Sequence, residues 1–147
     1  MKAYFDTSFL VSLYTPDANS TRAARAMQTS SATHLISTLG RLEAANALEL
    51  RVFRKEISAA QANSSLSDFE KDLQQGFFQL IPLPERVFER AHQLSRRTTA
   101  RLGTRTADLL HVAAAIELKA DYLYSFDQQQ RKLAQVVRLK TNRIRTN

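Results

Sequence analysis

The segment TADLLHVAAAIELK, Thr106–Lys119, is the most apolar helix that the sequence predicts. Its apolar side chains occupy nearly all sides of the helix: Leu109, Leu110, Val112, Ala113 and Ile116. A helix that is apolar all round is buried inside a protein. We therefore expect this helix in the middle of the fold, with the charged Asp108 in its first turn.

Short apolar runs alternate with helical segments along the rest of the chain. The runs predicted to be strands are Ala3–Phe5, His34–Ser37, Phe77–Leu83, Tyr122–Ser125 and Val136–Leu139. The other predicted helices are Thr7–Tyr14, Asp17–Ser30, Leu39–Ile57, Ser58–Gln75, Glu85–Arg101 and Gln128–Ala134. Strands separated by helices indicate an α/β fold of three layers (α/β/α), with a central parallel sheet of about five strands.

Length and composition predict one domain over residues 1–147, in which 138–147 form the last strand and a basic C-terminal tail. The absence of cysteine excludes a disulfide scaffold, a thiolate zinc site and a cysteine nucleophile. No apolar run approaches the roughly 18 residues of a membrane span. Asp6 interrupts the only segment, Ala3–Tyr14, that resembles a signal peptide. We therefore expect a cytoplasmic protein with no membrane partner.

Positive charge is concentrated in the second half of the chain. Residues 1–85 hold 8 basic and 9 acidic side chains, whereas residues 86–147 hold 13 and 5. A basic half of this kind favours a polyanionic partner, most simply nucleic acid. The alternative is that the positive charge serves only solubility. Candidate phosphate-binding residues near Asp108 are Arg96, Arg97, Arg101 and Arg105, unless they form only a solvated helix end. The acid-free run from Arg138 to Asn147 either contacts RNA or takes no part in RNA binding.

Four acids occupy similar places in the predicted fold. Asp6 and Asp127 follow strands, Glu43 lies early in the helix after the second strand, and Asp108 opens the apolar helix. Ligands bind beyond the carboxyl ends of parallel strands, so all four carboxylates are expected in one cleft. Each acid also has a local interpretation as a helix cap, turn residue or exposed residue. An unpaired charge beside the apolar neighbours of Asp108, however, is costly.

The expected cluster of carboxylates needs a neutralising partner. Two carboxylates about 4 Å apart repel by about 4 kcal/mol at an effective dielectric constant near 20. Either a proton or a cation must offset this repulsion. For a site with oxygen ligands and no cysteine, Mg²⁺ or Mn²⁺ is the natural cation. Such ions activate water for in-line displacement at a phosphodiester.

Four motifs resemble those of one family. They are Tyr4–Leu10 (YFDTSFL), Leu42–Leu48 (LEAANAL), Asp108–Ala115 (DLLHVAAA) and Leu123–Asp127 (LYSFD). In this order they resemble a PIN-domain ribonuclease, most closely the VapC toxin of a type II toxin–antitoxin pair. The resemblance covers nearly the whole chain.

This resemblance implies a Mg²⁺- or Mn²⁺-dependent endoribonuclease that forms a homodimer and is inhibited by a small antitoxin protein. It also implies that Asp6, Glu43, Asp108 and Asp127 bind the metal and catalyse, with Ser8 as an auxiliary group beside Asp6. The alternative is a non-catalytic PIN-like module that binds RNA or regulates. The polar run Gln128–Gln130 departs from the family pattern, and we assign it to RNA contact or partner docking rather than to chemistry.

Other residues have structural interpretations. His111, on or beside the face of Asp108, is interpreted as a packed histidine, with contact to the metal surroundings as the alternative. Five aromatic residues are predicted to belong to the core: Tyr4, Phe77, Phe78, Phe88 and Tyr122. The face formed by Phe53, Leu66, Phe69 and Leu73 serves either a partner or packing within the chain.

Overall fold

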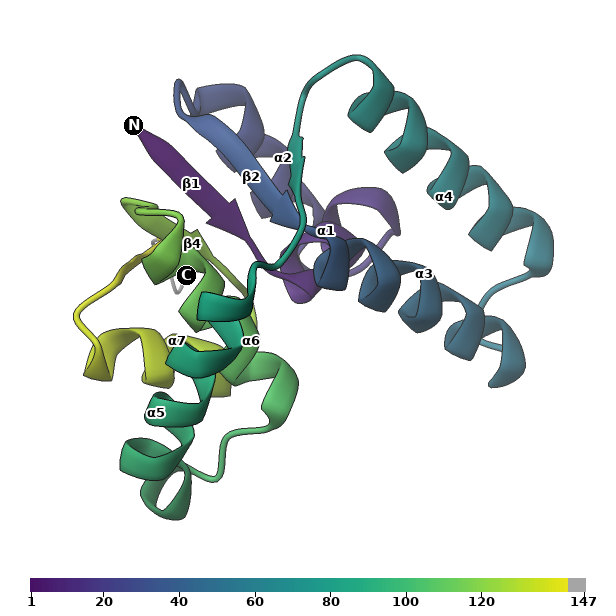
Figure 1. Ribbon diagram of the computed structural model, residues 1–147. Coiled ribbons are helices and arrows are strands. Elements are labelled where there is room, and N and C mark those ends of the chain that lie inside the picture. Colours follow the sequence, from purple (N-terminus) through teal and green to yellow (C-terminus); the bar gives the residue numbers. More distant parts are fainter. Residues whose placement is uncertain (143–147) are drawn as a thin grey trace.

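A computed structural model describes residues 1–142 and contains, in that range, a five-stranded parallel sheet (Figure 1). The strands are β1 (Lys2–Phe5), β2 (Thr33–Ser37), β3 (Gln79–Ile81), β4 (Tyr122–Tyr124) and β5 (Lys140–Thr141). Their order is β3-β2-β1-β4-β5, so β1 is central and pairs with both β2 and β4. The carboxyl end of β1, followed by Asp6, therefore lies in the middle of one edge of the sheet.

Helices cover both faces of this sheet. They are α1 (Thr7–Tyr14), α2 (Ser20–Thr29), α3 (Thr38–Phe53), α4 (Ala59–Gln74), α5 (Glu85–Leu102), α6 (Thr106–Glu117) and α7 (Gln128–Val136). Side chains alternate along β1: Tyr4 packs with α5, α6 and α7, whereas Ala3 and Phe5 pack with α1 to α4. The predicted three-layer fold is confirmed.

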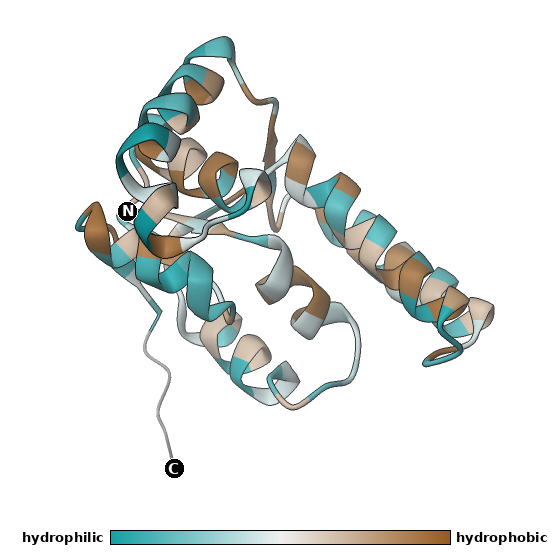
Figure 2. Ribbon diagram, turned by 90° about the horizontal axis from the view of Figure 1, so that it is seen from below, coloured by the Kyte–Doolittle hydropathy of each residue, from teal (hydrophilic) through white to brown (hydrophobic). Residues whose placement is uncertain are grey.

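The apolar helix α6 lies inside the layer formed with α5 and α7, as predicted. Every residue from Asp108 to Ala115 is buried. In contrast, Figure 2 shows hydrophilic and hydrophobic residues interleaved along outer helices, as expected of helices that bury one face. Burial of α6 on all sides holds its first turn in a fixed position against the sheet. None of the helices in residues 1–142 combines the length and apolarity needed to span a membrane.

The prediction for the last strand was wrong. Val136 ends α7, and Arg138 takes a left-handed conformation (φ 61°) in the turn that leads to β5 at Lys140–Thr141. Val137 and Leu139 pack against the core from this turn, so their apolarity reflects burial rather than strand pairing. The tail residues Arg143 and Arg145 lie outside the described residues. The third strand is also shorter than predicted.

Two aromatic predictions were also wrong. Phe77 and Phe88 are 56% and 54% exposed, whereas Tyr4 and Phe78 are buried and Tyr122 is half-buried. Phe77 and Phe78 lie in a bend just before β3, where the course of the chain rather than the residue type sets which side chain faces the core. In the apolar face considered above, Phe69 is buried and Leu66 and Leu73 pack against the core, whereas Phe53 is 83% exposed. Most of that face therefore serves packing within the chain.

Gly103 ends α5 in a left-handed conformation (φ 66°), just before the loop that leads to α6. A β-carbon in this conformation costs about 1 kcal/mol, so Gly103→Ala should lower the free energy of unfolding by that amount. Urea denaturation measures the change. Gly40 of α3 is the control, because an added Cβ would meet its nearest atom at 3.6 Å. Gly40→Ala should raise the same quantity by about 0.5–1 kcal/mol. Equal changes in both variants would contradict this account of Gly103.

Candidate active site

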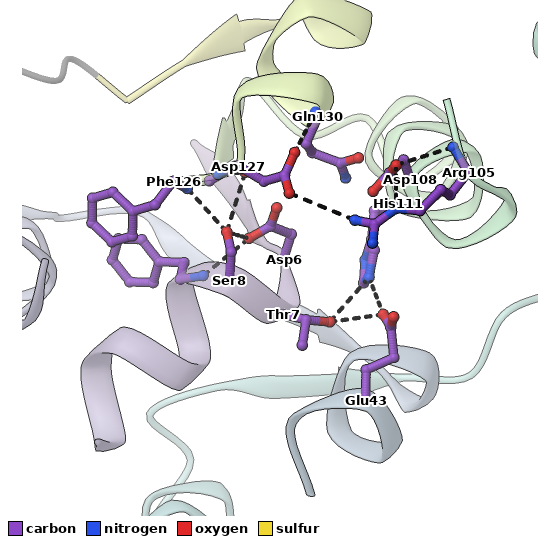
Figure 3. A network of polar contacts seen from close by, with 12 residues as sticks. Asp6, Thr7, Ser8, Glu43, Arg105, Asp108, His111, Phe126, Asp127 and Gln130 are labelled. Atoms are coloured by element: carbon purple, nitrogen blue, oxygen red, sulfur yellow. Dashed lines mark hydrogen bonds and ion pairs between the residues drawn. The ribbon is translucent and has the colours of Figure 1, made fainter. Parts of the chain in front are cut away.

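One cleft of about 480 Å³ opens at the carboxyl edge of the sheet and is lined by Asp6, Glu43, Asp108 and Asp127 (Figure 3). Asp6 follows β1 directly, and Asp127 follows β4 and precedes α7. Glu43 lies near the start of α3, which follows β2, and Asp108 lies in the first turn of α6. The structure thus brings together the four acids that the sequence singled out.

Asp6 is the most deeply buried of these acids, with 3% of its surface exposed. Its Oδ1 accepts hydrogen bonds from the backbone N–H of Phe9, at 3.0 Å, and from the hydroxyl of Ser8, at 2.7 Å. Burial raises the pKa of the Asp6 carboxyl, although the charge of His111 and the hydrogen bonds act in the opposite direction. Asp6 therefore caps α1 and lines the cleft at the same time.

Ser8 connects Asp6 to the chain that follows β4. Its Oγ accepts the backbone N–H of Phe126 at 3.0 Å while its hydroxyl donates to Asp6. Figure 3 shows Ser8 between the two segments. The auxiliary position beside Asp6 that the sequence suggested for Ser8 is the position that the structure shows.

Arg105 lies between two of the acids. Its Nε is 3.4 Å from Oδ2 of Asp108, and its Nη2 is 3.6 Å from Oδ2 of Asp127. Hydrogen bonding to Asp108 raises the pKa of the guanidinium further above its ordinary value. The side chain of Arg105 is 74% exposed, so these ion pairs are weakened by solvent. Arg105 supplies an exchangeable counter-charge to the cleft.

Glu43 is held by a buried network. Its Oε1 lies 2.5 Å from Nε2 of His111 and accepts the hydroxyl of Thr7 at 2.7 Å. The hydroxyl of Tyr4 is 2.8 Å from Nδ1 of His111 and donates to Oγ of Ser37 at 2.8 Å. Burial alone would raise the pKa of Glu43, but hydrogen bonds from His111 and Thr7 outweigh it and lower the pKa. Glu43 is therefore held ionised and oriented.

The interpretation of His111 as a packed histidine is confirmed, and its contact with the metal surroundings stays a prediction. His111 is buried, with 3% of its surface exposed, and it also bonds to an acid of the cleft. The sequence reasoning missed Thr7 and the role of the Tyr4 hydroxyl. Their signal was position: Thr7 follows Asp6 directly, and Tyr4 precedes it by two residues. Residues near the end of a central strand lie next to whatever binds there.

The four arginines proposed for phosphate contact do not share one surface. Only Arg105 lines the cleft. Arg97 and Arg101 line a separate groove between α5 and the turn after α7, and Arg96 is exposed on α5. Arg51, which the sequence reasoning did not select, also lines the cleft. Sequence distance from Asp108 was a poor guide, because Arg97 and Arg101 lie on the face of α5 that borders the turn after α7.

The donor set of the cleft fits a hard cation, since carboxylate oxygens are the ligands that Mg²⁺ and Mn²⁺ prefer. Within residues 1–142, however, no three His, Asp or Glu side chains stand close enough to hold an ion as they are. In this arrangement Arg105 contacts Asp108 and Asp127, and His111 contacts Glu43. A cation held by these acids would therefore require Arg105, which contacts two of them, to move.

The Tyr4 hydroxyl makes the network behind Glu43 testable. Tyr4→Phe leaves Ser37 and His111 without this partner in a buried place, so the free energy of unfolding should fall by about 1–3 kcal/mol. Urea denaturation measures the change. Tyr124→Phe, on the adjacent β4, is the control, because that side chain is only half-buried and does not belong to this network. Equal losses in the two variants would show that the network adds nothing to the free energy of unfolding.

Solved structures from three bacteria share this fold. VapC20 of Mycobacterium tuberculosis, a sarcin–ricin loop cleaving toxin, matches with a TM-score of 0.71 and 17% identity, over 88% of this chain and 93% of that chain. VapBC2 of Rickettsia felis, solved with a fragment of promoter DNA, matches at 0.67 and 18%, over 97% and 98%. FitAcB of Neisseria gonorrhoeae matches at 0.68 and 16%, over 96% of both chains.

At these identities the similarity concerns the fold. No curated protein sequence matches the chain. The family model described as PIN domain matches residues 3–136, which include all four acids of the cleft. The chain belongs to the PIN domain family.

Proposed function

We propose that this protein is a metal-dependent endoribonuclease and the toxin of a toxin–antitoxin pair. The observation that carries the proposal is the convergence of Asp6, Glu43, Asp108 and Asp127, from four separate segments, on one cleft. Placing several carboxylates together costs free energy, and this cost is expected where the group performs chemistry. Family membership and the fold shared with VapC and FitAcB structures support the same conclusion.

In this proposal Asp6, Glu43, Asp108 and Asp127 hold Mg²⁺ or Mn²⁺ and form the catalytic set. The bound ion would supply an activated water and offset the charge of the phosphodiester. The chain's own residues prepare the site for it. Ser8 orients Asp6, and the hydrogen bonds of His111 and Thr7 keep Glu43 ionised.

RNA is the proposed substrate, because the second half of the chain is basic and the cleft is open to solvent beside an exposed guanidinium. Once a cation neutralises the acids, Arg105 is free to contact a phosphate, as a guanidinium does well. Among the four arginines considered from the sequence, this contact is proposed for Arg105 alone. VapC20 cleaves the sarcin–ricin loop, so a structured RNA hairpin is the first substrate to test.

A small antitoxin is the proposed protein partner, together with a second copy of this chain as a homodimer in the cytoplasm. Structures similar to this one include the VapBC2 and FitAcB assemblies. Within residues 1–142, three large apolar side chains of α3 are exposed: Leu42 at 67%, Leu50 at 40% and Phe53 at 83%. An exposed apolar set of this kind is typical of an interaction site.

Loss of one carboxylate tests the nuclease proposal. Asp6→Asn should reduce cleavage of an RNA hairpin in Mn²⁺ more than about 100-fold, because the remaining acids hold the ion poorly. A chelator should abolish cleavage by the unaltered protein. Asp121→Asn is the control, since Asp121 is exposed and bonds to Lys2 at the opposite edge of the sheet. Gel analysis of end-labelled RNA measures the rates.

Two results would contradict the nuclease proposal. Cleavage by Asp6→Asn at the control rate would show that the reaction does not depend on the acids of the cleft. Salt-sensitive RNA binding with no product from the unaltered protein would instead support a non-catalytic module.

Removal of Arg105 tests its competition with the ion. Arg105→Gln should tighten Mn²⁺ binding severalfold, because a positive charge leaves the neighbourhood of Asp108 and Asp127. The same variant should bind RNA more weakly. Arg51→Gln is the control, since Arg51 lines the cleft without an ion pair to either acid. Isothermal titration calorimetry measures the Mn²⁺ affinity, and weaker binding to Arg105→Gln would overturn the competition.

A further inference from the structure

Gln130, in the first turn of α7, carries a buried amide that lacks partners. The residue is 1% exposed, and neither Nε2 nor Oε1 has a hydrogen-bond partner in residues 1–142. Its backbone N–H donates to Oδ1 of Asp127 at 3.0 Å, which fixes the residue beside the cleft. Figure 3 shows its side chain extending from α7 toward Asp108, with the carboxylate of Asp127 beside its backbone.

A buried amide without partners destabilises a fold, because it has lost its hydrogen bonds to water and gained none. A leucine of similar size would fill the same space without this cost. Gln128 and Gln129, the preceding residues, are exposed and have no such cost. In the described part of the chain, only the hydroxyl of Thr15 shares this lack of partners. Such unpaired polar groups are rare in folded proteins, and a role in catalysis or ion binding is one explanation for them.

The four carboxylates are not held equally well. Asp6 is fixed by Ser8 and Phe9, and Glu43 by His111 and Thr7.

Asp108 and Asp127, in contrast, share one side-chain partner in residues 1–142, the exposed guanidinium of Arg105, at 3.4 and 3.6 Å. Each otherwise accepts one backbone N–H, from Arg105 and Gln130 respectively. When Arg105 leaves, these two side chains need another donor. The unpartnered amide of Gln130, which Figure 3 shows between the two acids, is the group available.

We propose that Gln130 is a positioning residue, whose buried amide donates a hydrogen bond to Asp127 or Asp108 when a divalent cation displaces Arg105. This inference rests on the proposed nuclease function and adds a residue to it. It also corrects the assignment of Gln130 to RNA contact or partner docking, since a side chain with 1% exposure reaches neither. For the exposed Gln128 and Gln129 that assignment stays a prediction. In the ion-free state the amide is unpaired, which lowers the stability of the fold. In the ion-bound state it forms its hydrogen bond.

The test is Gln130→Leu in the full chain, with three measurements. Without divalent ions the melting temperature should rise by a few degrees, because the unpaired amide is gone. The Kd for Mn²⁺, from calorimetry, should rise about tenfold, as when a residue that orients ligands is removed. The kcat for RNA hairpin cleavage should fall by a similar factor with KM unchanged.

Gln130→Met keeps the unbranched shape of glutamine without its hydrogen bonds and should behave as Gln130→Leu does. Gln135→Leu is the matched control, because Gln135 is an exposed glutamine of the same helix, away from the cleft. It should leave both the Mn²⁺ affinity and kcat unchanged.

Mn²⁺ affinity and kcat equal to those of the unaltered protein would overturn the role of Gln130 and leave the nuclease proposal standing. A lower melting temperature would overturn it too, because the amide would then be paired already in the ion-free state. If the unaltered protein neither binds Mn²⁺ nor cleaves RNA, the nuclease proposal itself fails, and this inference fails with it.

Discussion

Negative charge gathered at the carboxyl edge of the sheet is the constraint on which the rest of the structure depends. Four carboxylates share one cleft, and the most buried of them, Asp6, has a raised pKa because it is removed from water. The chain offsets this charge with Arg105 in solvent and His111 in the core. Arg105 contacts Asp108 and Asp127 only through an exposed side chain, so an external cation can replace it. A buried partner for Asp108 and Asp127 would not be replaced by an external cation in this way.

The fold supplies a second device for holding these acids. Asp6 caps α1, Asp127 caps α7, and Asp108 bonds to the backbone N–H at the start of α6. Helix N-termini carry partial positive charge and unpaired N–H groups, so they stabilise carboxylates. Because these helices begin at one edge of a parallel sheet, helix capping and cleft formation use the same side chains. The capping role of these acids is therefore compatible with their place in the cleft.

Sequence patterns predicted the elements that are decided by local chemistry. The apolar pattern of α6 indicated its burial, and the strands β1 and β2 were placed within a residue or two. The prediction failed where burial has another cause: Val137 and Leu139 are packed in a turn after α7 rather than in a strand. Likewise Phe77 and Phe78 are the same residue type, and only the direction of the chain before β3 decides which one is buried.

The sequence by itself determined the three-layer α/β fold and the convergence of four acids, because strand order and helix starts place these residues at one edge. Only the tertiary structure decided their partners: that Arg105 rather than Arg97 reaches the acids, that His111 bonds to Glu43, and that Gln130 is buried. These outcomes depend on which side chains from distant segments meet within hydrogen-bond distance. Periodicity along one segment carries no information about the residues of another that pack against it.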